Sequence, residues 1–420
     1  MINASKKAEL IIENRDDLSL FLALKPEVAG IYYNSPKSSL NDQYINSGKP
    51  YIICDIGAGT VDICTHKKII NEDRNAELIE EYPPLGGPLG GQFINEKFIK
   101  TFITEIFGEE KVNKLKNDLT NEDWNEFEIK IERLKQSYSE EKSTILKLDC
   151  HEFDDESIDR KLDYYISKYN SKNHKYQIKK IKKWEISFPS QIFSDITKEI
   201  SKKIFEKIEE IYNNVNTGYI IFTGAGSKNK NISYWISKFA KEKNIKIEIR
   251  TPAQPEIAVI KGAVLFGLKN STIRKRKSRY TIGIRIYLNW DEKKHKDKGK
   301  KEDNKLRGPQ CCNLFSKFIT RNQYIGFEEV ISHEYDAISP HPKILFYKTL
   351  RKDCTYIDEK DETDKPIINK FGEIEFDIGK DYDIKNRSTR IDMKLGGTYI
   401  YVSAEYLKNG KKIKTTQTFV

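Results

Sequence analysis

The chain has 420 residues, of which 38% are hydrophobic and 32% charged, and its formal net charge is +10 at pH 7. Most lysines and arginines alternate with acidic residues, as over residues 198–210, which is typical of solvated helix faces and argues against nucleic-acid binding. No stretch approaches the roughly 20 apolar residues of a membrane span, and the polar residues 1–14 lack the core of a signal peptide. We therefore expect a cytoplasmic protein without a membrane partner.

The N-terminal third of the chain alternates between helical and strand signals. Residues 1–33 predict a helix, an interruption at Pro26 and a second helical start at residue 27, and residues 34–50 predict an exposed loop. Two short strands joined by a glycine turn are then predicted at residues 51–54 and 61–65.

The middle of the chain is predicted to be mainly helical and then to alternate strand and helix. Helices are predicted at residues 92–116 and 121–138, and a helix with a surface excursion at 155–183. Isoleucines at every fourth position predict a long amphipathic helix over residues 190–213. After it, strands are expected at residues 219–223 and 246–250, and helices at residues 233–243 and 256–266. Their alternation predicts an α/β layer with a largely parallel sheet.

The last third predicts a charged segment followed by strands. Residues 291–307 are almost wholly charged and predict a disordered linker. The strands expected after it lie at residues 343–347, 373–378, 390–395 and 398–405, with hairpin turns at 396–397 and 409–410.

The six cysteines stand at positions 54, 64, 150, 311, 312 and 354. They form no C-x-x-C pair and no cluster with the spacing of metal ligands, which favours a reducing, intracellular setting. Cys54 and Cys64 lie in apolar runs and are expected to be buried thiols.

The strongest chemical signal is the motif at residues 55–62, which reads Asp-Ile-Gly-Ala-Gly-Thr-Val-Asp between two apolar strands. Gly57 and Gly59 let the backbone come close to a phosphate, and successive amides in such a turn bind anions. Thr60 adds a hydroxyl, and Asp55 could hold a magnesium-bound water. The alternative is an ordinary hairpin with a polar tip.

Two further glycine turns follow. Residues 86–91, which include Gly90 and Gly91, lead into a helix whose free amides suit an anion, although a flexible connection would look the same. Residues 223–227 follow a strand of the α/β layer, where ligands collect. They fit neither a Walker loop nor a dinucleotide fingerprint, and a tight strand–helix turn is the alternative.

Glu132 and Lys135 share one helical face because they stand three residues apart. Most such pairs are surface ion pairs. The other interpretation is that the two side chains bind a nucleotide.

The order of the three glycine turns resembles the actin, heat-shock and sugar-kinase ATPase superfamily. Within it, several segments resemble the heat shock 70 kDa protein 12 branch. They cover residues 23–32, 55–62, 87–93, 255–267 and 277–283. The resemblance covers most of the chain and is looser at residues 151–185 and over the last hundred residues.

This resemblance implies an α/β fold of the actin-like (ribonuclease H-like) type: a second ATPase lobe with a remnant of the first, followed by a C-terminal β-rich domain. The implied parts are the first-lobe remnant with a crossing helix at residues 1–50, the second lobe at 51–275 with a helical insertion at about 92–190, a charged linker at 276–309, and a β-rich, substrate-binding-like domain at 310–420.

The resemblance also implies ATP or ADP with Mg²⁺ as cofactors. Asp55 and Thr60 would be the catalytic residues, and Asp55 would also face the metal. The remaining implied contacts with the nucleotide are Gly57, Ala58, Gly59, Gly90, Gly91, Glu132, Lys135, Gly224, Ala225, Gly226 and Glu256.

Three departures from the family pattern weaken the expected catalysis. Nothing before Ala23 matches a first phosphate loop. Lys25 stands where the family has a glutamate near the attacking water, although Glu27 is two residues away. Gln136 stands where an arginine commonly packs on the base.

The sequence therefore predicts an ATP-binding, chaperone-related protein whose hydrolysis is weak or absent. An unfolded client protein is a possible partner. A non-enzymatic scaffold that descends from such a protein is the main alternative, and a small-molecule kinase of the same superfamily is a more remote one.

Overall fold

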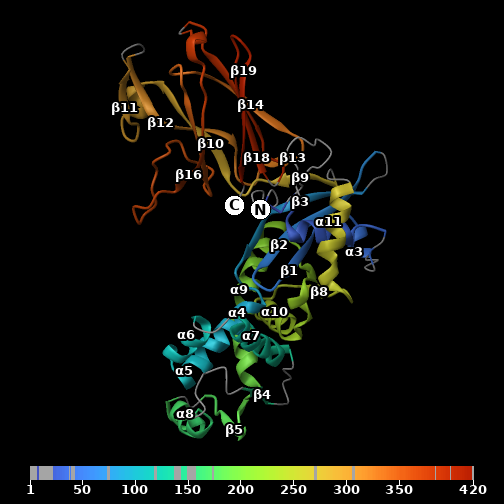
Figure 1. Cartoon of the computed structure of the whole chain (residues 1–420). Coiled ribbons are helices and arrows are strands. Elements are labelled where there is room, and N and C mark those ends of the chain that lie inside the picture. The colour runs from blue at the N-terminus through green and yellow to red at the C-terminus, as the bar shows by residue number, and fades with distance from the viewer. Residues whose placement is uncertain are drawn as a thin grey trace. The chain divides into compact units, whose positions relative to one another are not determined.

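The computed structural model describes residues 7–8, 22–36, 38, 43–72, 76–117, 121–136, 143–148, 158–172, 175–268, 272–304, 308–383, 385–397 and 399–418 (Figure 1). The helix predicted before residue 22 therefore lies almost wholly outside the described residues, as does Cys150.

A seven-stranded mixed sheet is the framework of the α/β part, with the order β13-β9-β3-β2-β1-β7-β8. Its strands are β1 (Tyr51–Ile56), β2 (Val61–Ile70), β3 (Ala76–Gly87), β7 (Tyr219–Thr223), β8 (Glu248–Arg250), β9 (Ile273–Lys277) and β13 (Tyr324–Gly326). β1 pairs in parallel with β7, and β7 pairs in parallel with β8. Every residue of β1 and β7 is buried, as expected for strands covered on both faces.

The long amphipathic helix predicted from its isoleucines is α9 (Gln191–Val215). The five isoleucines are all buried, at positions 192, 196, 200, 204 and 208, and α9 packs against α10 (Lys230–Glu242). The other helices with predicted counterparts are α2 (Lys25–Tyr33), α4 (Gly91–Phe98), the π-helical turn Ile99–Ile103, α5 (Thr104–Phe107), α6 (Glu109–Asn117), α7 (Asn121–Gln136), α8 (Ile158–Lys172) and α11 (Ala258–Leu268).

The second helical start, predicted at residue 27, is confirmed as α2, and Pro26 lies in its first turn, where its missing amide costs no hydrogen bond. A short helix, α3 (Gln43–Asn46), lies inside the segment predicted to be a loop. The helix predicted over residues 92–116 is interrupted at Gly108, whose φ of 92° is available to glycine.

A small three-stranded sheet, which the sequence did not predict, lies beside the helices of the insertion. Its order is β4-β6-β5, and its strands are β4 (Thr144–Lys147), β5 (Lys179–Lys182) and β6 (Glu185–Phe188). Its core is aromatic: the ring of Phe98 lies 5.0 Å from Phe188 and 4.9 Å from Phe193 between centroids.

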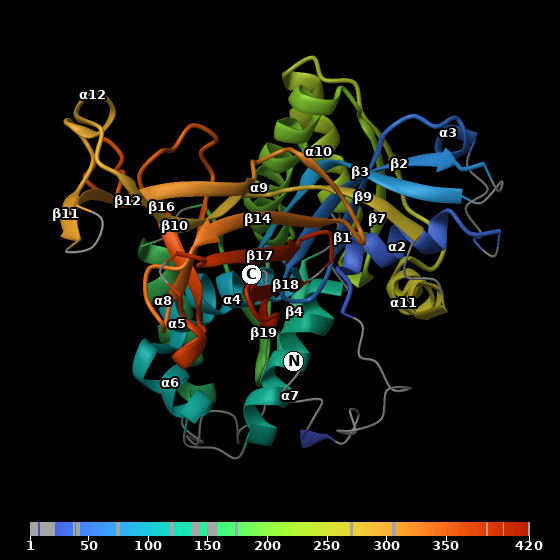
Figure 2. The ribbon, with the colours of Figure 1, turned by 90° about the horizontal axis from the view of Figure 1, so that it is seen from above.

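The β-rich part consists of two sheets (Figure 2). The two sheets share one hydrophobic core. The five-stranded sheet has the order β11-β12-β10-β15-β16, with β10 (Thr281–Asn289), β11 (Lys301–Asn304), β12 (Gly308–Ile319), β15 (Lys343–Thr349) and β16 (Ile368–Glu375). The four-stranded sheet has the order β14-β17-β18-β19, with β14 (Val330–Asp336), β17 (Ser388–Lys394), β18 (Tyr399–Tyr406) and β19 (Lys411–Thr418). The hairpin turns predicted at residues 396–397 and 409–410 connect β17 to β18 and β18 to β19.

The charged segment predicted to be a disordered linker is a structured hairpin where it is described. Asp291 caps the short helix α12 (Glu292–His295) by accepting a hydrogen bond from the Lys293 amide at 3.0 Å. His295 is only 6% exposed and stacks edge-on against Trp290. Pairing of β11 with β12 then orders the charged residues 301–303, whose composition alone favours disorder.

The chain divides into two compact units. One consists of Met1–Pro50, Thr65–Pro84 and Gly262–Val420, and the other of Tyr51–Cys64 and Leu85–Lys261. The division passes through β2 and β3 of one sheet, so it does not test the predicted domain boundaries, which stay a prediction. No helix in the described part of the chain is long and apolar enough to cross a membrane.

Candidate functional site

The tip of the β1–β2 hairpin forms a tight, exposed turn. The Gly57 amide donates to the Thr60 carbonyl at 2.9 Å and closes the turn. Ala58 and Gly59 are exposed at its tip, whereas Asp55 at its base is only 3% exposed. The Thr60 hydroxyl donates to Asp62 at 2.8 Å, so it would have to rotate to donate to a ligand.

The second glycine turn supports the first from behind. The amides of Gly91 and Gln92, at the start of α4, donate to the carbonyls of Gly57 at 3.0 Å and Ala58 at 2.7 Å. A Cβ atom on Gly90 would lie 2.3 Å from the Ala58 carbonyl oxygen, so only glycine fits there. Helix α4 therefore uses its first free amides to hold the carbonyls of the turn.

This arrangement leaves amides, rather than carbonyls, available at the tip. The amides of Ala58 and Gly59 donate to no acceptor among the described residues. Two adjacent exposed amides with their carbonyls tied back form the kind of concavity that binds anions. Gly90 and Gly91 act here as supports of that turn, and direct contact between them and a ligand stays a prediction.

The third glycine turn lies directly against the first. Parallel pairing places Asp55 of β1 opposite Thr223 of β7, so both turns leave the same edge of the sheet. Gly224 has a φ of 80°, and a Cβ atom on it would lie 2.4 Å from Asp55 Oδ1. A Cβ atom on Gly226, in the 3₁₀ turn Ala225–Lys228, would lie 2.6 Å from the Ile56 side chain. The backbone of the third turn thus contacts the base of the first.

Glu256 lies beside this third turn. It belongs to the 3₁₀ turn Pro255–Ile257, and the Pro255 carbonyl accepts hydrogen bonds from the Gly224 amide at 3.1 Å and the Thr223 hydroxyl at 2.7 Å. Glu256 itself is exposed and pairs with Lys228 at 2.9 Å. The hydrogen bond from Lys228 lowers the pKa of Glu256.

Glu132 and Lys135 of α7 are joined to the start of α4. Lys135 Nζ lies 2.5 Å from Glu132 Oε2 and donates to the Gly91 carbonyl at 3.1 Å. Asn95 of α4 donates to the same Glu132 oxygen at 2.8 Å. Burial opposes ionisation of Glu132, but the hydrogen bonds from Lys135 and Asn95 outweigh it and lower its pKa. Glu132 and Lys135 therefore join α7 to α4, which an isolated surface ion pair would not do.

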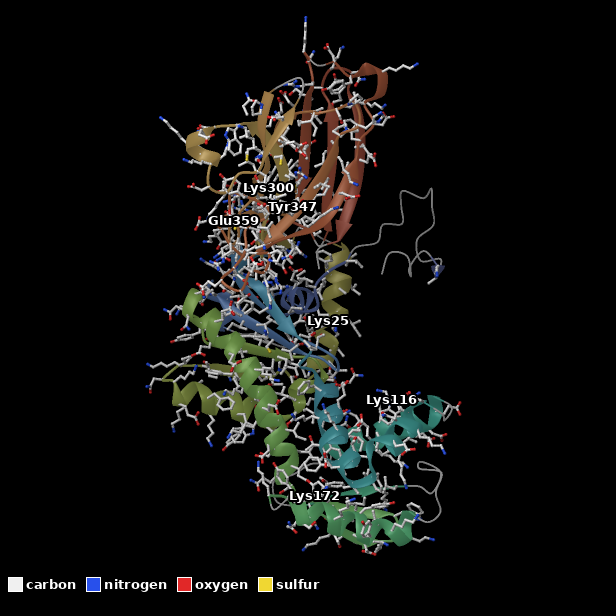
Figure 3. All side chains as sticks on the ribbon, turned by 90° about the vertical axis from the view of Figure 1, so that its left-hand side faces the viewer. Lys25, Lys116, Lys172, Lys300, Tyr347 and Glu359 are labelled. Atoms are coloured by element: carbon white, nitrogen blue, oxygen red, sulfur yellow. The ribbon has the colours of Figure 1, made fainter. Side chains whose placement is uncertain are left out.

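Glu27 cannot supply the carboxylate that the family has at the position of Lys25. Its side chain is completely buried and holds the Arg276 guanidinium with two hydrogen bonds of 2.8 Å. Lys25 is exposed at the first position of α2 (Figure 3). The suggestion that Glu27 stands in for the missing glutamate is therefore wrong, because its charge is neutralised in the protein interior.

The described residues contain no cluster of three or more His, Cys, Asp or Glu side chains that could hold a metal ion by itself. A single buried carboxylate, Asp55, suits Mg²⁺, which keeps most of its waters and takes few protein ligands. Cys54 and Cys64 are buried, as predicted. Burial and the charges of Asp55 and Asp62 raise the pKa of the Cys54 thiol, which makes it unreactive.

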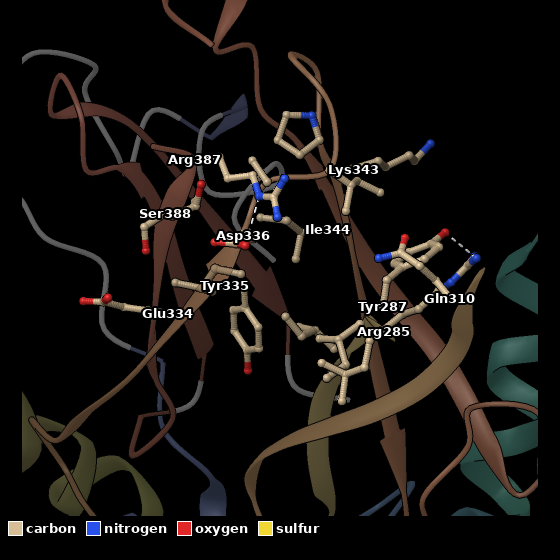
Figure 4. A pocket seen from close by; sticks show the side chains of 18 of the residues that line it. Arg285, Tyr287, Gln310, Glu334, Tyr335, Asp336, Lys343, Ile344, Arg387 and Ser388 are labelled. Atoms are coloured by element: carbon tan, nitrogen blue, oxygen red, sulfur yellow. Dashed lines mark hydrogen bonds and ion pairs between the residues drawn. The ribbon is translucent and has the colours of Figure 1, made fainter. Parts of the chain in front are cut away.

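Sequence reasoning missed two features. Asn95 stands four residues after Gly91 and thus on the same face of α4, a spacing that could have pointed to it. A pocket of about 610 Å³ in the β-rich part gave no local signal, because its lining comes from several separate strands (Figure 4).

Comparisons with known proteins find sequence similarity to heat-shock proteins. No protein-family model matches it. Heat shock 70 kDa protein 12A from Mus musculus and from Homo sapiens are each 23% identical to it over 393 residues, 90% of this chain and 55% of the relative. Heat shock 70 kDa protein 12B from Homo sapiens is 20% identical over 398 residues. The chain spans about half the length of these curated relatives.

Among solved structures, the pCBH ParM non-polymerisable quadruple mutant is 17% identical and covers 57% of this chain and 52% of its own, with a TM-score of 0.33. The resemblance inferred from the sequence is confirmed by the curated relatives. The chain is similar in sequence to the heat shock 70 kDa protein 12 proteins over 90% of its length, and its architecture is of the α/β class with further β-sheets.

Proposed function

We propose that the three glycine turns form one half of a nucleotide site in which the amides of Ala58 and Gly59 receive the phosphates of ATP or ADP. The observation that carries this proposal is the convergence of the turns. α4 ties back the carbonyls of the first turn, and the third turn contacts its base at Asp55. A merely structural hairpin would not need two neighbouring glycine turns against it.

The chemistry of each residue follows from its place. Asp55 would hold a water of a phosphate-bound Mg²⁺, which when bound would neutralise charge on the phosphates. The Gly224–Gly226 turn offers a surface whose only side chain is the Ala225 methyl group to the sugar or base. Glu132 and Lys135, fastened to α4, could grip the ribose or base by hydrogen bonds.

Hydrolysis by this chain should be weak or absent. Phosphoryl transfer depends on charged groups positioned around the phosphates and the attacking water. Glu27 is committed to Arg276, and Lys25 carries the wrong charge to orient a metal-bound water. Binding without efficient turnover is therefore the expected behaviour.

Titration calorimetry with Mg-ATP and Mg-ADP tests the proposal. The variant Ala58→Glu places a negative charge at the exposed tip, where it should repel phosphates and weaken binding about tenfold or more, equivalent to about 1.4 kcal/mol. Ser171→Glu on α8, which is exposed in the same unit, is the matched control and should bind as the parent does. Binding that Ala58→Glu leaves unchanged would remove the site. Micromolar affinity with steady turnover would instead contradict the weak-hydrolysis proposal.

A second candidate activity, the binding of an extended client segment by the β-rich part, is favoured by one observation. β10 pairs with β15 only from Thr281 to Ile284, opposite Phe346 to Thr349. Beyond that point the ladder is open, and the 610 Å³ pocket is lined there by β10 residues 284–289 together with Pro342, Lys343 and Ile344 (Figure 4). The pairing of β15 with β16 is irregular at Phe346, where the pairing of β15 with β10 also ends. Such bulges bend strands.

An open ladder exposes unpaired backbone groups to which an extended peptide can add as a strand. Fluorescence anisotropy of labelled aliphatic peptides would test this. Ile338→Glu, in the pocket lining, should abolish the binding, and Val330→Glu, exposed on β14 outside the lining, should not. Peptide binding that persists without any nucleotide binding would favour the scaffold alternative. The small-molecule kinase alternative has no such observation in its favour.

A further inference from the structure

Four ionisable side chains meet in the interior of one compact unit. They are Glu27 of α2, His66 of β2, Glu80 of β3 and Arg276 of β9, and none is more than 9% exposed. None of the sequence motifs includes this cluster. The proposed nucleotide site does not include it either, because Glu27 is paired with Arg276 and cannot face a metal ion. Burying four ionisable groups together is costly, so their arrangement calls for a physical reason.

Arg276 is the centre of the cluster and uses all three nitrogens of its guanidinium. Nε and Nη2 donate to the two carboxylate oxygens of Glu27, each at 2.8 Å, in a bidentate fork. Nη1 donates to the carbonyl of Gly396, in the turn between β17 and β18. One side chain therefore joins α2, near the beginning of the described chain, to the C-terminal four-stranded sheet.

The turn that Arg276 holds is also fitted closely to β13. A Cβ atom on Gly396 would lie 2.0 Å from the Gly326 carbonyl oxygen, so the contact requires glycine. β13 is in turn paired with β9, with Ile325 opposite Arg276. The Phe327 ring lies 5.7 Å from the guanidinium carbon and covers it. The turn, β13 and β9 thus surround the guanidinium.

Glu80 makes the charge balance of the cluster unusual. One of its oxygens accepts a hydrogen bond from the Lys277 amide at 3.1 Å, and the other has no hydrogen-bond partner among the described residues. Arg276 donates its two parallel hydrogen bonds to Glu27 rather than to Glu80, although both carboxyl groups lie near it. The two hydrogen bonds to Glu27 fix the orientation of the guanidinium, so that its remaining donor, Nη1, points at the Gly396 carbonyl.

We propose that Arg276 is an internal latch: its ion pair with Glu27 orients the guanidinium so that it holds the β17–β18 turn, and α2 thereby controls how the four-stranded sheet is seated on β9 and β13. This role is independent of nucleotide binding. Replacing a buried ion pair by apolar groups is often neutral for stability, whereas directional hydrogen bonds give one defined arrangement. The latch supplies orientation rather than net stability.

Hydrogen–deuterium exchange of the full chain tests the latch through Glu27→Gln. The substituted side chain would touch no part of the turn, yet the change would remove the charge that orients Arg276. Amides in peptides containing Leu395–Gly397 should then exchange about tenfold faster than in the parent. Asp336→Asn, which breaks the Arg387–Asp336 pair elsewhere in the β-rich part, is the control and should leave that turn unchanged. Faster exchange in α2 alone would overturn the proposal.

Arg276→Lys provides a second test, because Arg276→Met could fail to fold. A lysine keeps the charge but cannot donate to both Glu27 oxygens and the Gly396 carbonyl at once. The turn should therefore lose protection while the protein still melts cooperatively. Parent-like protection of the turn in Arg276→Lys would show that the fork is not needed and would refute the latch.

Discussion

Gly224 illustrates how strongly the candidate site depends on single backbone positions. Its φ of 80° and its contact with Asp55 and Ile56 leave no room for a side chain. The sequence suggested this glycine as a ligand contact, with a simple turn as the alternative. The structure adds that it is also the point where two glycine turns touch, so a substitution there acts on both.

Gly224→Ala should destabilise the protein by about 2 kcal/mol or more, because alanine would be strained at this φ and would overlap Asp55. It should also weaken nucleotide binding. Denaturant unfolding and calorimetry measure the two effects. Gly267→Ala in α11, where a Cβ atom meets nothing within 4 Å, is the control and should be neutral or slightly stabilising. Equal stabilities of the two variants would contradict the tight contact.

Glu80 should make stability depend on pH. Burial and the neighbouring Glu27 raise its pKa well above its usual range. A raised pKa in the folded state means that its contribution to stability is complete at acidic pH and is lost as pH rises towards the folded pKa. Glu80→Gln cannot ionise, so it should gain stability relative to the parent on going from pH 5 to pH 8.

Urea denaturation at both pH values measures this difference. The exposed Glu334→Gln provides a control for the loss of a carboxylate in general. A stability difference between Glu80→Gln and the parent that stays constant over this range would show that Glu80 is not the titrating group.

At the scale of elements, predictions from hydrophobic periodicity were confirmed, whereas a strand rich in polar residues was not predicted. The isoleucine repeat predicted α9 because burial of one helix face requires that spacing. β3 was missed, since it carries Glu77, Glu80 and Glu81 and has two prolines near its end. Its partners β2 and β9 decide its conformation, and the charges that it buries are matched only in three dimensions.

The contact between α7 and α4 gives the prediction at this scale. Lys135→Met would remove the hydrogen bond to the Gly91 carbonyl and leave Glu132 without its cation. Because α4 holds the carbonyls of the first glycine turn, where we propose that phosphates bind, nucleotide affinity should fall by about threefold to tenfold. Arg133→Met, exposed on the same helix, is the matched control and should bind normally. Equal affinities in a nucleotide-binding assay would argue against a role for α7.

At the scale of the whole molecule, the three turns belong to one compact unit, Tyr51–Cys64 with Leu85–Lys261. A ligand that binds the folded state protects the region that it contacts from local opening. Saturating Mg-ATP should therefore slow amide exchange at residues 55–62, 90–92 and 223–227, and the Ala58→Glu variant should lose this protection. Protection found only in the β-rich part would place the nucleotide elsewhere.

The sequence by itself determined the α/β class, the three glycine turns, the long helix α9, the C-terminal hairpins and the resemblance that curated relatives confirm. These depend on local signals: periodicity, glycine conformations and motif spacing. Only the tertiary structure decided that α4 supports the first glycine turn, that Glu27 pairs with Arg276, that the charged segment folds into a hairpin, and that β10 and β15 separate over a pocket. Each of these depends on pairing between residues far apart in the chain, and a buried charge or an open strand edge has no local signature.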